Sequence, residues 1–139
     1  MKKILVAVTL LVIIFSACRS KANKEAAEKD RYEQAKKMLE EKEKTNPADF
    51  LKVSSMDKHN LIGQTVIKGS ITNGAKICVY KDVELELRFF SKTGVLLEKD
   101  KETIYDVIEP GKSATFKTKY FAPKGTDSVV LKIVGAKNK

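Results

Sequence analysis

Two patterns of polar and apolar positions divide the chain. Residues 20–44, "SKANKEAAEKDRYEQAKKMLEEKEK", are rich in charged residues and alanine and contain no glycine or proline. From residue 50 onward, apolar and polar residues alternate in short runs. Alternation is typical of half-buried strands, because successive side chains of a strand point to opposite faces. The pattern therefore predicts a charged α-helical stalk followed by a mainly β domain.

The alternating runs predict about seven short strands in this domain. Glycine, proline and asparagine mark the turns between them, as in Asn73-Gly74 and Pro110-Gly111. The runs lie near residues 50–55, 64–72, 76–80, 82–90, 95–101, 113–120 and 128–136, with a less regular one at 102–108. This spacing favours an antiparallel, immunoglobulin-like sandwich of about seven strands, with a closed barrel as the alternative.

Four segments carry a family resemblance: "IKGSITN", "KDVELELRFFSKTGVLLE", "IEPGKSATFKTKY" and "VVLKIVGAK". Together they resemble the FxLYD-type, late-embryogenesis-like sandwich domains of bacteria over roughly residues 60–136. The matching positions are Gly69, Ile71, Asn73, Val83, Leu85, Leu87, Phe89, Phe90, Gly94, Pro110, Gly111, Ser113 and Phe116. Ser91 stands where the family usually has Asp, and Phe90 where it often has Tyr. The resemblance implies the sandwich fold and brings no catalytic residues.

The stalk sequence favours a helix that ends near Asn46-Pro47. Glu25–Lys29, Glu33–Lys37 and Glu40–Lys44 are spaced by four residues with the acid first, the order that stabilises a helix. The apolar residues are too sparse for a coiled coil. Two interpretations stay open, a spacer helix and a partly frayed tether, because isolated helices of this length are marginal in water. A basic helix lying on anionic lipid is a third, less favoured interpretation, because its apolar face is thin.

The N-terminus has the features of an export signal. Lys2 and Lys3 precede residues 4–17, which carry no charge and are too few to span a membrane. The next feature, Phe15-Ser16-Ala17-Cys18, resembles a bacterial lipobox, although Phe15 replaces the usual leucine. The resemblance implies cleavage before Cys18 and a lipid on its thiol. An ordinary signal-peptidase cut and an uncleaved anchor are the alternatives.

These segments predict a lipoprotein signal peptide at 1–17, a lipid-anchored helical tether at 18–47 and a β-sandwich domain at 48–139. Arg19 and Ser20, not aspartate, follow Cys18, and no acidic cluster comes next. By comparison with known lipoproteins, this predicts a location in the cell envelope, on the outer membrane facing the periplasm if the cell has one.

Charge adds a weaker indication. The chain has 27 basic and 18 acidic residues, for a formal charge of +9. Such an excess favours contact with anionic head groups or acidic polysaccharide, although it also serves solubility alone. Nucleic acid is not an expected partner of an exported protein.

Candidates for catalysis are few, since the chain has two cysteines and one histidine. Cys78 with His59 would form a thiol and its base, but Cys78 lies in an apolar stretch and fits a small buried core residue better. Glu84 and Glu86 share a strand face, yet two ligands are too few for calcium. We therefore expect no enzyme activity, no cofactor and no metal.

The sequence thus predicts a non-enzymatic envelope lipoprotein, held in the membrane through Cys18, that displays a β-sandwich to an envelope protein partner as an interaction or assembly module. The alternative is a carrier or sensor of a small or lipidic ligand held in the sandwich.

Overall fold

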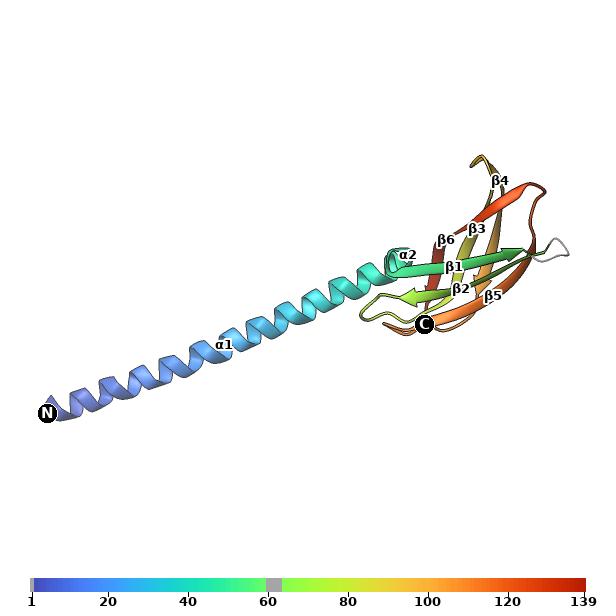
Figure 1. Cartoon of the computed structure of the whole chain (residues 1–139). Coiled ribbons are helices and arrows are strands. Elements are labelled where there is room, and N and C mark those ends of the chain that lie inside the picture. The colour runs from blue at the N-terminus through green and yellow to red at the C-terminus, as the bar shows by residue number, and fades with distance from the viewer. Residues whose placement is uncertain (1, 60–63) are drawn as a thin grey trace. The chain divides into compact units, whose positions relative to one another are not determined.

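The computed structural model describes the backbone of residues 2–59 and 64–139 and the side chains of residues 24–55 and 65–139. It confirms a mainly β domain preceded by a helix (Figure 1). The helices are α1 (Lys2–Thr45) and the short α2 (Pro47–Phe50). The strands are β1 (Leu51–His59), β2 (Gln64–Asn73), β3 (Tyr80–Ser91), β4 (Leu96–Ile104), β5 (Ser113–Phe121) and β6 (Thr126–Asn138).

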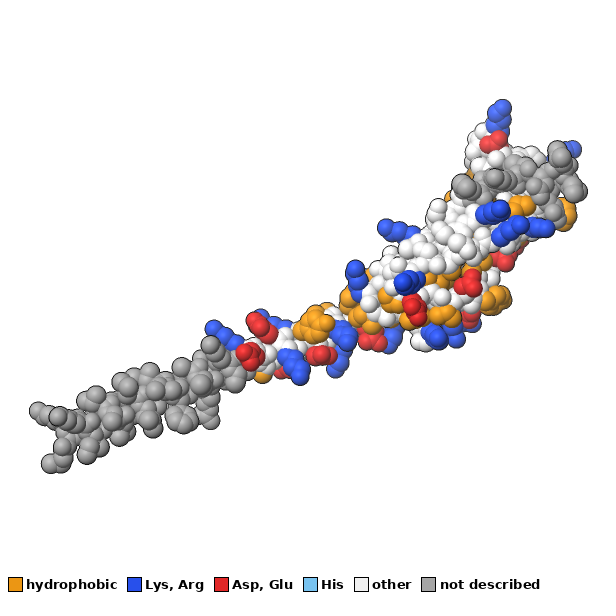
Figure 2. Space-filling model, turned by 60° about the horizontal axis from the view of Figure 1, so that its bottom comes forward, with side chains coloured by type: hydrophobic (Ala, Val, Ile, Leu, Met, Phe, Trp, Pro, Cys, Tyr) orange, Lys and Arg blue, Asp and Glu red, His pale blue; other side chains and the backbone are white. Residues whose placement is uncertain are grey.

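The chain forms two compact units, Met1–Leu39 and Glu40–Lys139. The described part of the first unit is a helix with interspersed acidic and basic side chains (Figure 2). Its apolar side chains Tyr32 and Met38 are 67% and 72% exposed. Within the described residues, no helix combines the length and apolar character needed to cross a membrane.

The strands of the second unit form two antiparallel sheets, in the orders β1-β2-β5 and β4-β3-β6 (Figure 1). Alternation explains the core, because Val83, Leu85, Leu87 and Phe89 of β3 all point inward and are at most 2% exposed. The buried core also includes Leu51, Ile67, Ile71, Ala75, Cys78, Tyr80, Ile104, Ile108, Phe116 and Ile133. This arrangement is a two-layer β-sandwich.

Two of the predicted strands do not form. Residues 76–79 lie in a loop, and β3 begins only at Tyr80. The stretch at 102–108 divides, so that its first part completes β4 and Ile108 makes a single bridge to Tyr80. The described residues therefore contain six strands instead of about seven.

A glycine on β2 allows close approach to the ring of Phe116 on β5. Gly69 pairs with Phe116 across the two strands, and a Cβ atom at Gly69 would lie 2.6 Å from the Cζ of Phe116. The same Cβ would lie 2.4 Å from the backbone carbonyl oxygen of Ser54, which cannot move aside as a side chain would.

We expect Gly69→Ala to lower the free energy of unfolding by about 2–3 kcal/mol, because overpacking forces the neighbouring backbone to shift. Urea unfolding followed by circular dichroism measures the change. Gly135→Ala is the matched control, since a Cβ there would meet no atom within 4 Å. Equal midpoints for the two variants would contradict the expectation.

Candidate functional site

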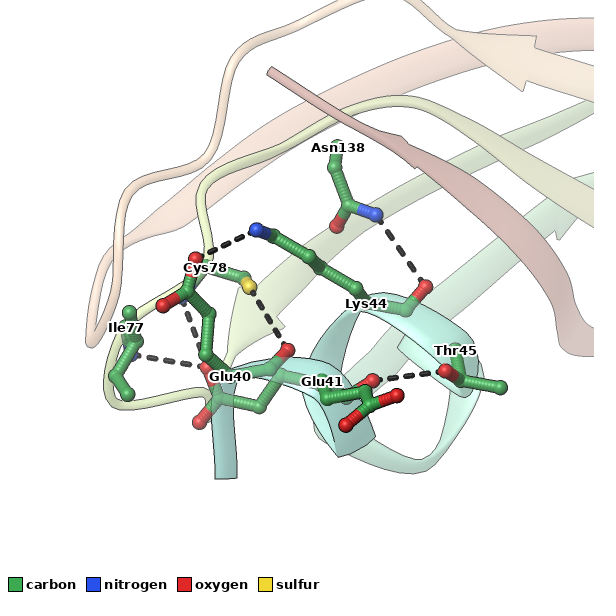
Figure 3. A network of polar contacts seen from close by, with 8 residues as sticks. Glu40, Glu41, Lys44, Thr45, Ile77, Cys78 and Asn138 are labelled. Atoms are coloured by element: carbon green, nitrogen blue, oxygen red, sulfur yellow. Dashed lines mark hydrogen bonds and ion pairs between the residues drawn. The ribbon is translucent and has the colours of Figure 1, made fainter. Parts of the chain in front are cut away.

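A buried carboxylate at the end of α1 forms the centre of the candidate site. Glu43 is 0% exposed. Its Oε1 accepts a hydrogen bond from the backbone N–H of Lys76 at 2.7 Å. Its Oε2 accepts from the N–H groups of Ile77 and Cys78, at 3.0 and 2.8 Å. Three successive N–H groups of one loop thus converge on one carboxylate; Figure 3 shows the surrounding network.

This arrangement resolves an electrostatic conflict in the sequence. The C-terminal end of a helix carries partial negative charge, so an acid in the last turn is unfavourable there. Successive backbone N–H groups in a loop form a concave anion-binding nest. The nest at residues 76–78 supplies the positive partial charge that the helix end lacks.

Side chains of the sandwich also satisfy the helix carbonyl groups. The last four carbonyls of a helix have no partner within it. The buried hydroxyl of Tyr80 donates to the carbonyl of Glu43 at 2.8 Å, and the amide of Asn138 donates to that of Lys44 at 3.3 Å. The Cys78 thiol lies 3.7 Å from the carbonyl oxygen of Glu40 (Figure 3). The helix therefore ends on groups that the β domain provides.

Asn73 holds the nest loop in shape. Its side chain is 0% exposed, and its Nδ2 donates to the carbonyls of Cys78 and Ile108, both at 2.9 Å. Its Oδ1 accepts from the N–H of Ala75 at 2.9 Å. One asparagine thus joins the loop at 74–79 to the segment before β5. We call Glu43, Asn73, Tyr80 and the N–H groups of residues 76–78 the Glu43 anchor.

The electrostatics of the anchor follow from burial and from these hydrogen bonds. Burial by itself would raise the pKa of Glu43, but the hydrogen bonds from the three backbone N–H groups outweigh it, and the net effect lowers that pKa. Burial, followed by the Glu43 charge, raises the pKa of Cys78. Burial also raises the pKa of Tyr80 to about 12. The carboxylate is therefore ionised while the thiol and phenol keep their protons at neutral pH.

These protonation states suit structure better than catalysis. A nucleophilic cysteine needs a lowered pKa, because the thiolate is the reactive form. The raised pKa and the 5% exposure of Cys78 both work against that form. Cys78 is buried as expected, but in the nest loop and not in a strand.

Of the other residues singled out in the sequence, the structure describes the side chains of Glu84 and Glu86. The side chains of Cys18 and His59 lie outside the described residues, and so does any Cys78–His59 contact. Glu84 is exposed, whereas Glu86 pairs with Arg88 at 2.5 Å. Among the side chains that the structure describes, no three His, Cys, Asp or Glu residues are placed to hold a metal ion.

Sequence reasoning missed the main residue of the site. In the sequence, Glu43 is one of many charged residues in the stalk, and Asn73-Gly74 is typical of an ordinary turn. The one available signal was the acid in the last helical turn, where basic residues are favoured.

The anchor should make stability depend on acid pH. Because the pKa of Glu43 is lowered in the folded state, the unfolded chain binds its proton more tightly. The stabilisation is complete above the ordinary value of 4.5 and is lost as the pH falls through the folded-state pKa.

Urea midpoints measured from about pH 5 to about pH 3 should therefore fall more steeply for the native chain than for Glu43→Gln, which has no carboxyl group to titrate there. Parallel pH profiles for the two proteins would contradict the assigned direction of the shift.

Fold and site together define a two-sheet antiparallel β domain that fixes the end of an N-terminal helix with a buried carboxylate. No protein-family model, curated protein or solved structure matches the chain.

Proposed function

We propose that this protein is a non-enzymatic, lipid-anchored protein of the cell envelope, and that its sandwich is a protein-interaction or assembly module. The observation that carries the proposal is the Glu43 anchor. Among the described side chains, Glu43 is the only buried carboxylate, and it is used to hold the end of the N-terminal helix. In the proposed protein this junction joins the tether to the displayed sandwich.

The sandwich is proposed to be of the immunoglobulin-like, FxLYD type. Supporting this, the neighbours β1, β2 and β5 correspond to immunoglobulin strands A, B and E, and β3 beside β6 corresponds to C beside F. The strand β4 then takes the place of C′, next to C. The raised pKa of Cys78 supports a non-enzymatic role, because the thiolate is the reactive form of cysteine.

The proposed membrane attachment is a lipid on Cys18, with the signal peptide cleaved between Ala17 and Cys18. It rests on Lys2, Lys3, the uncharged residues 4–17 and the lipobox-like Phe15–Cys18. The absence of aspartate after Cys18 supports an outer membrane location facing the periplasm where the cell has two membranes.

Metabolic labelling with a fatty-acid probe in a bacterial host tests the lipid attachment at Cys18. The native chain should incorporate the probe and shift to the detergent phase, and Cys18→Ala should do neither, because only a thiol can form the thioether bond to the lipid. Cys78→Ala is the control, since it removes the other cysteine and should label like the native chain. Labelling of Cys18→Ala would overturn the lipid anchor.

The interaction role is tested in intact cells by chemical crosslinking through the exposed lysines. The native chain should give one discrete species of higher mass, and a folded chain recovered only as a monomer would contradict the module.

A further inference from the structure

Among its described side chains, the outer face of the sheet β1-β2-β5 carries only positive charge. Alternation along the strands places Lys52 of β1, Lys68 of β2, and Lys117 and Lys119 of β5 on this face, and all four are exposed. Most of the uncharged outward positions with described side chains carry hydroxyl groups, on Ser54, Ser70, Thr72, Ser113 and Thr115; the exceptions are Val66, which is buried, and Phe121. None of the outward positions with a described side chain is acidic. We call these residues the lysine face.

Three of the four lysines, Lys68, Lys117 and Lys119, lie close to one another, whereas Lys52 pairs with Thr72 further along β2. Lys68 and Lys117 are direct partners across β2 and β5, and Lys119 follows Lys117 on the same side of β5. Like charges directly opposite each other on a sheet repel and destabilise it. The ion pairs found among the described residues involve none of these lysines. An anionic ligand would relieve this repulsion.

The outer face of the other sheet differs. There Glu84, Glu86 and Arg88 of β3 lie beside Lys99 and Lys101 of β4, so both signs alternate. Arg88 and Glu86 form an ion pair on that face. The lysine face is therefore not a sample of a uniformly basic surface.

We propose that the lysine face binds an acidic polysaccharide, a linear polymer whose sugar rings carry carboxylates. The ammonium groups would pair with the carboxylates, and the hydroxyl groups between them would hydrogen-bond to sugar hydroxyls. Thr72 and Ser113 already hold their hydroxyls 2.7 Å apart on this face. At the end of the β5 row, Phe121 is 77% exposed and offers a ring for the apolar side of a sugar.

A lipid surface fits this face less well. Proteins that lie on membranes combine basic residues with an apolar surface that enters the acyl region. The lysine face offers hydroxyl groups between its lysines, with Phe121 as its one large exposed apolar side chain among the described residues.

The inference deepens the proposed function. It rests on that function only for the location, the cell envelope, in which the protein would meet the polymer. The binding itself is measured on the purified full chain in a neutral detergent, so it can fail or succeed independently of the lipid labelling of Cys18.

The experiment titrates the full chain with polygalacturonate by calorimetry, with uncharged dextran as the control polymer. Polygalacturonate should bind, more weakly at about 200 mM than at about 50 mM NaCl, because salt screens exposed charges. Lys117→Gln/Lys119→Gln should weaken binding about tenfold or more, while Lys99→Gln/Lys101→Gln should stay within about twofold of the native chain.

The two double variants are matched, since each neutralises two exposed lysines, two residues apart, on the outermost strand of its sheet. Lys68→Gln gives a third variant on the lysine face and should also weaken binding. Equal losses in the two double variants would show that binding follows net charge and would overturn the proposal. So would the absence of binding at low salt, or binding only to vesicles of phosphatidylglycerol and phosphatidylcholine, which would assign the face to lipid.

Discussion

Replacing Glu43 with alanine is expected to lower the free energy of unfolding by about 3–5 kcal/mol, a large part of the total stability of a small domain. The reason is that the N–H groups of residues 76–78 lose their shared acceptor. Each hydrogen bond to a charged group is worth about 1.5–3 kcal/mol, and a buried donor left without a partner adds its desolvation cost. Urea unfolding of the full chain, followed by circular dichroism, measures the loss.

Two variants sharpen this test. Glu41→Ala removes an exposed acid from the same helical turn and should change the stability by no more than about 0.5 kcal/mol. Glu43→Gln keeps the size and one acceptor oxygen but turns an amide donor toward the N–H groups, so its loss should fall between the other two. If Glu43→Ala matched Glu41→Ala, the buried carboxylate would have no role in holding the fold.

A truncated chain that begins at residue 47 is expected to lose about as much stability as Glu43→Ala, or more. It lacks the carboxylate and also the helix carbonyls that accept from Tyr80 and Asn138. A chain that begins at residue 36 keeps all of them, together with the preceding helical turn, and should unfold cooperatively with a midpoint close to that of the full chain.

Thermal and urea unfolding of the two truncated chains make the comparison. Their difference locates the start of the folded domain, because the structure groups Glu40–Thr45 with the strands. Equal stability of the two chains would mean that the last helical turn does not belong to the domain.

The Glu43 anchor bears on the proposed function. In the proposed function the sandwich is displayed from a tether, and the Glu43 anchor is the junction between the two. Hydrogen bonds from a single loop and from β3 and β6 hold the helix end at this junction. The lysine face lies on β1, β2 and β5 and shares no residue with the anchor, although Thr72 of the face directly precedes Asn73 of the anchor on β2.

The sequence by itself determined most of the strands. The runs at 64–72, 82–90 and 113–120 lie within β2, β3 and β5, because each of these strands buries one face and leaves the other in water. The difference between the buried and the solvated face appears in the sequence as alternating apolar and polar residues over a few positions. It also determined the helix and its end near Asn46-Pro47, since helix formers, spacing and a proline stop act within a few residues. The lipid on Cys18 stays a prediction of the sequence.

The tertiary structure alone decided the nest loop and the role of Glu43. Ile77, Cys78 and Val79 form an apolar run like that of a strand, yet the N–H groups of Ile77 and Cys78 bond to a carboxylate from the helix. Glu43 and Cys78 are 35 residues apart, so no local pattern can show that they meet. A charged residue in a helix is ordinarily solvated, and only the fold brings together enough donors to make burial of this one favourable.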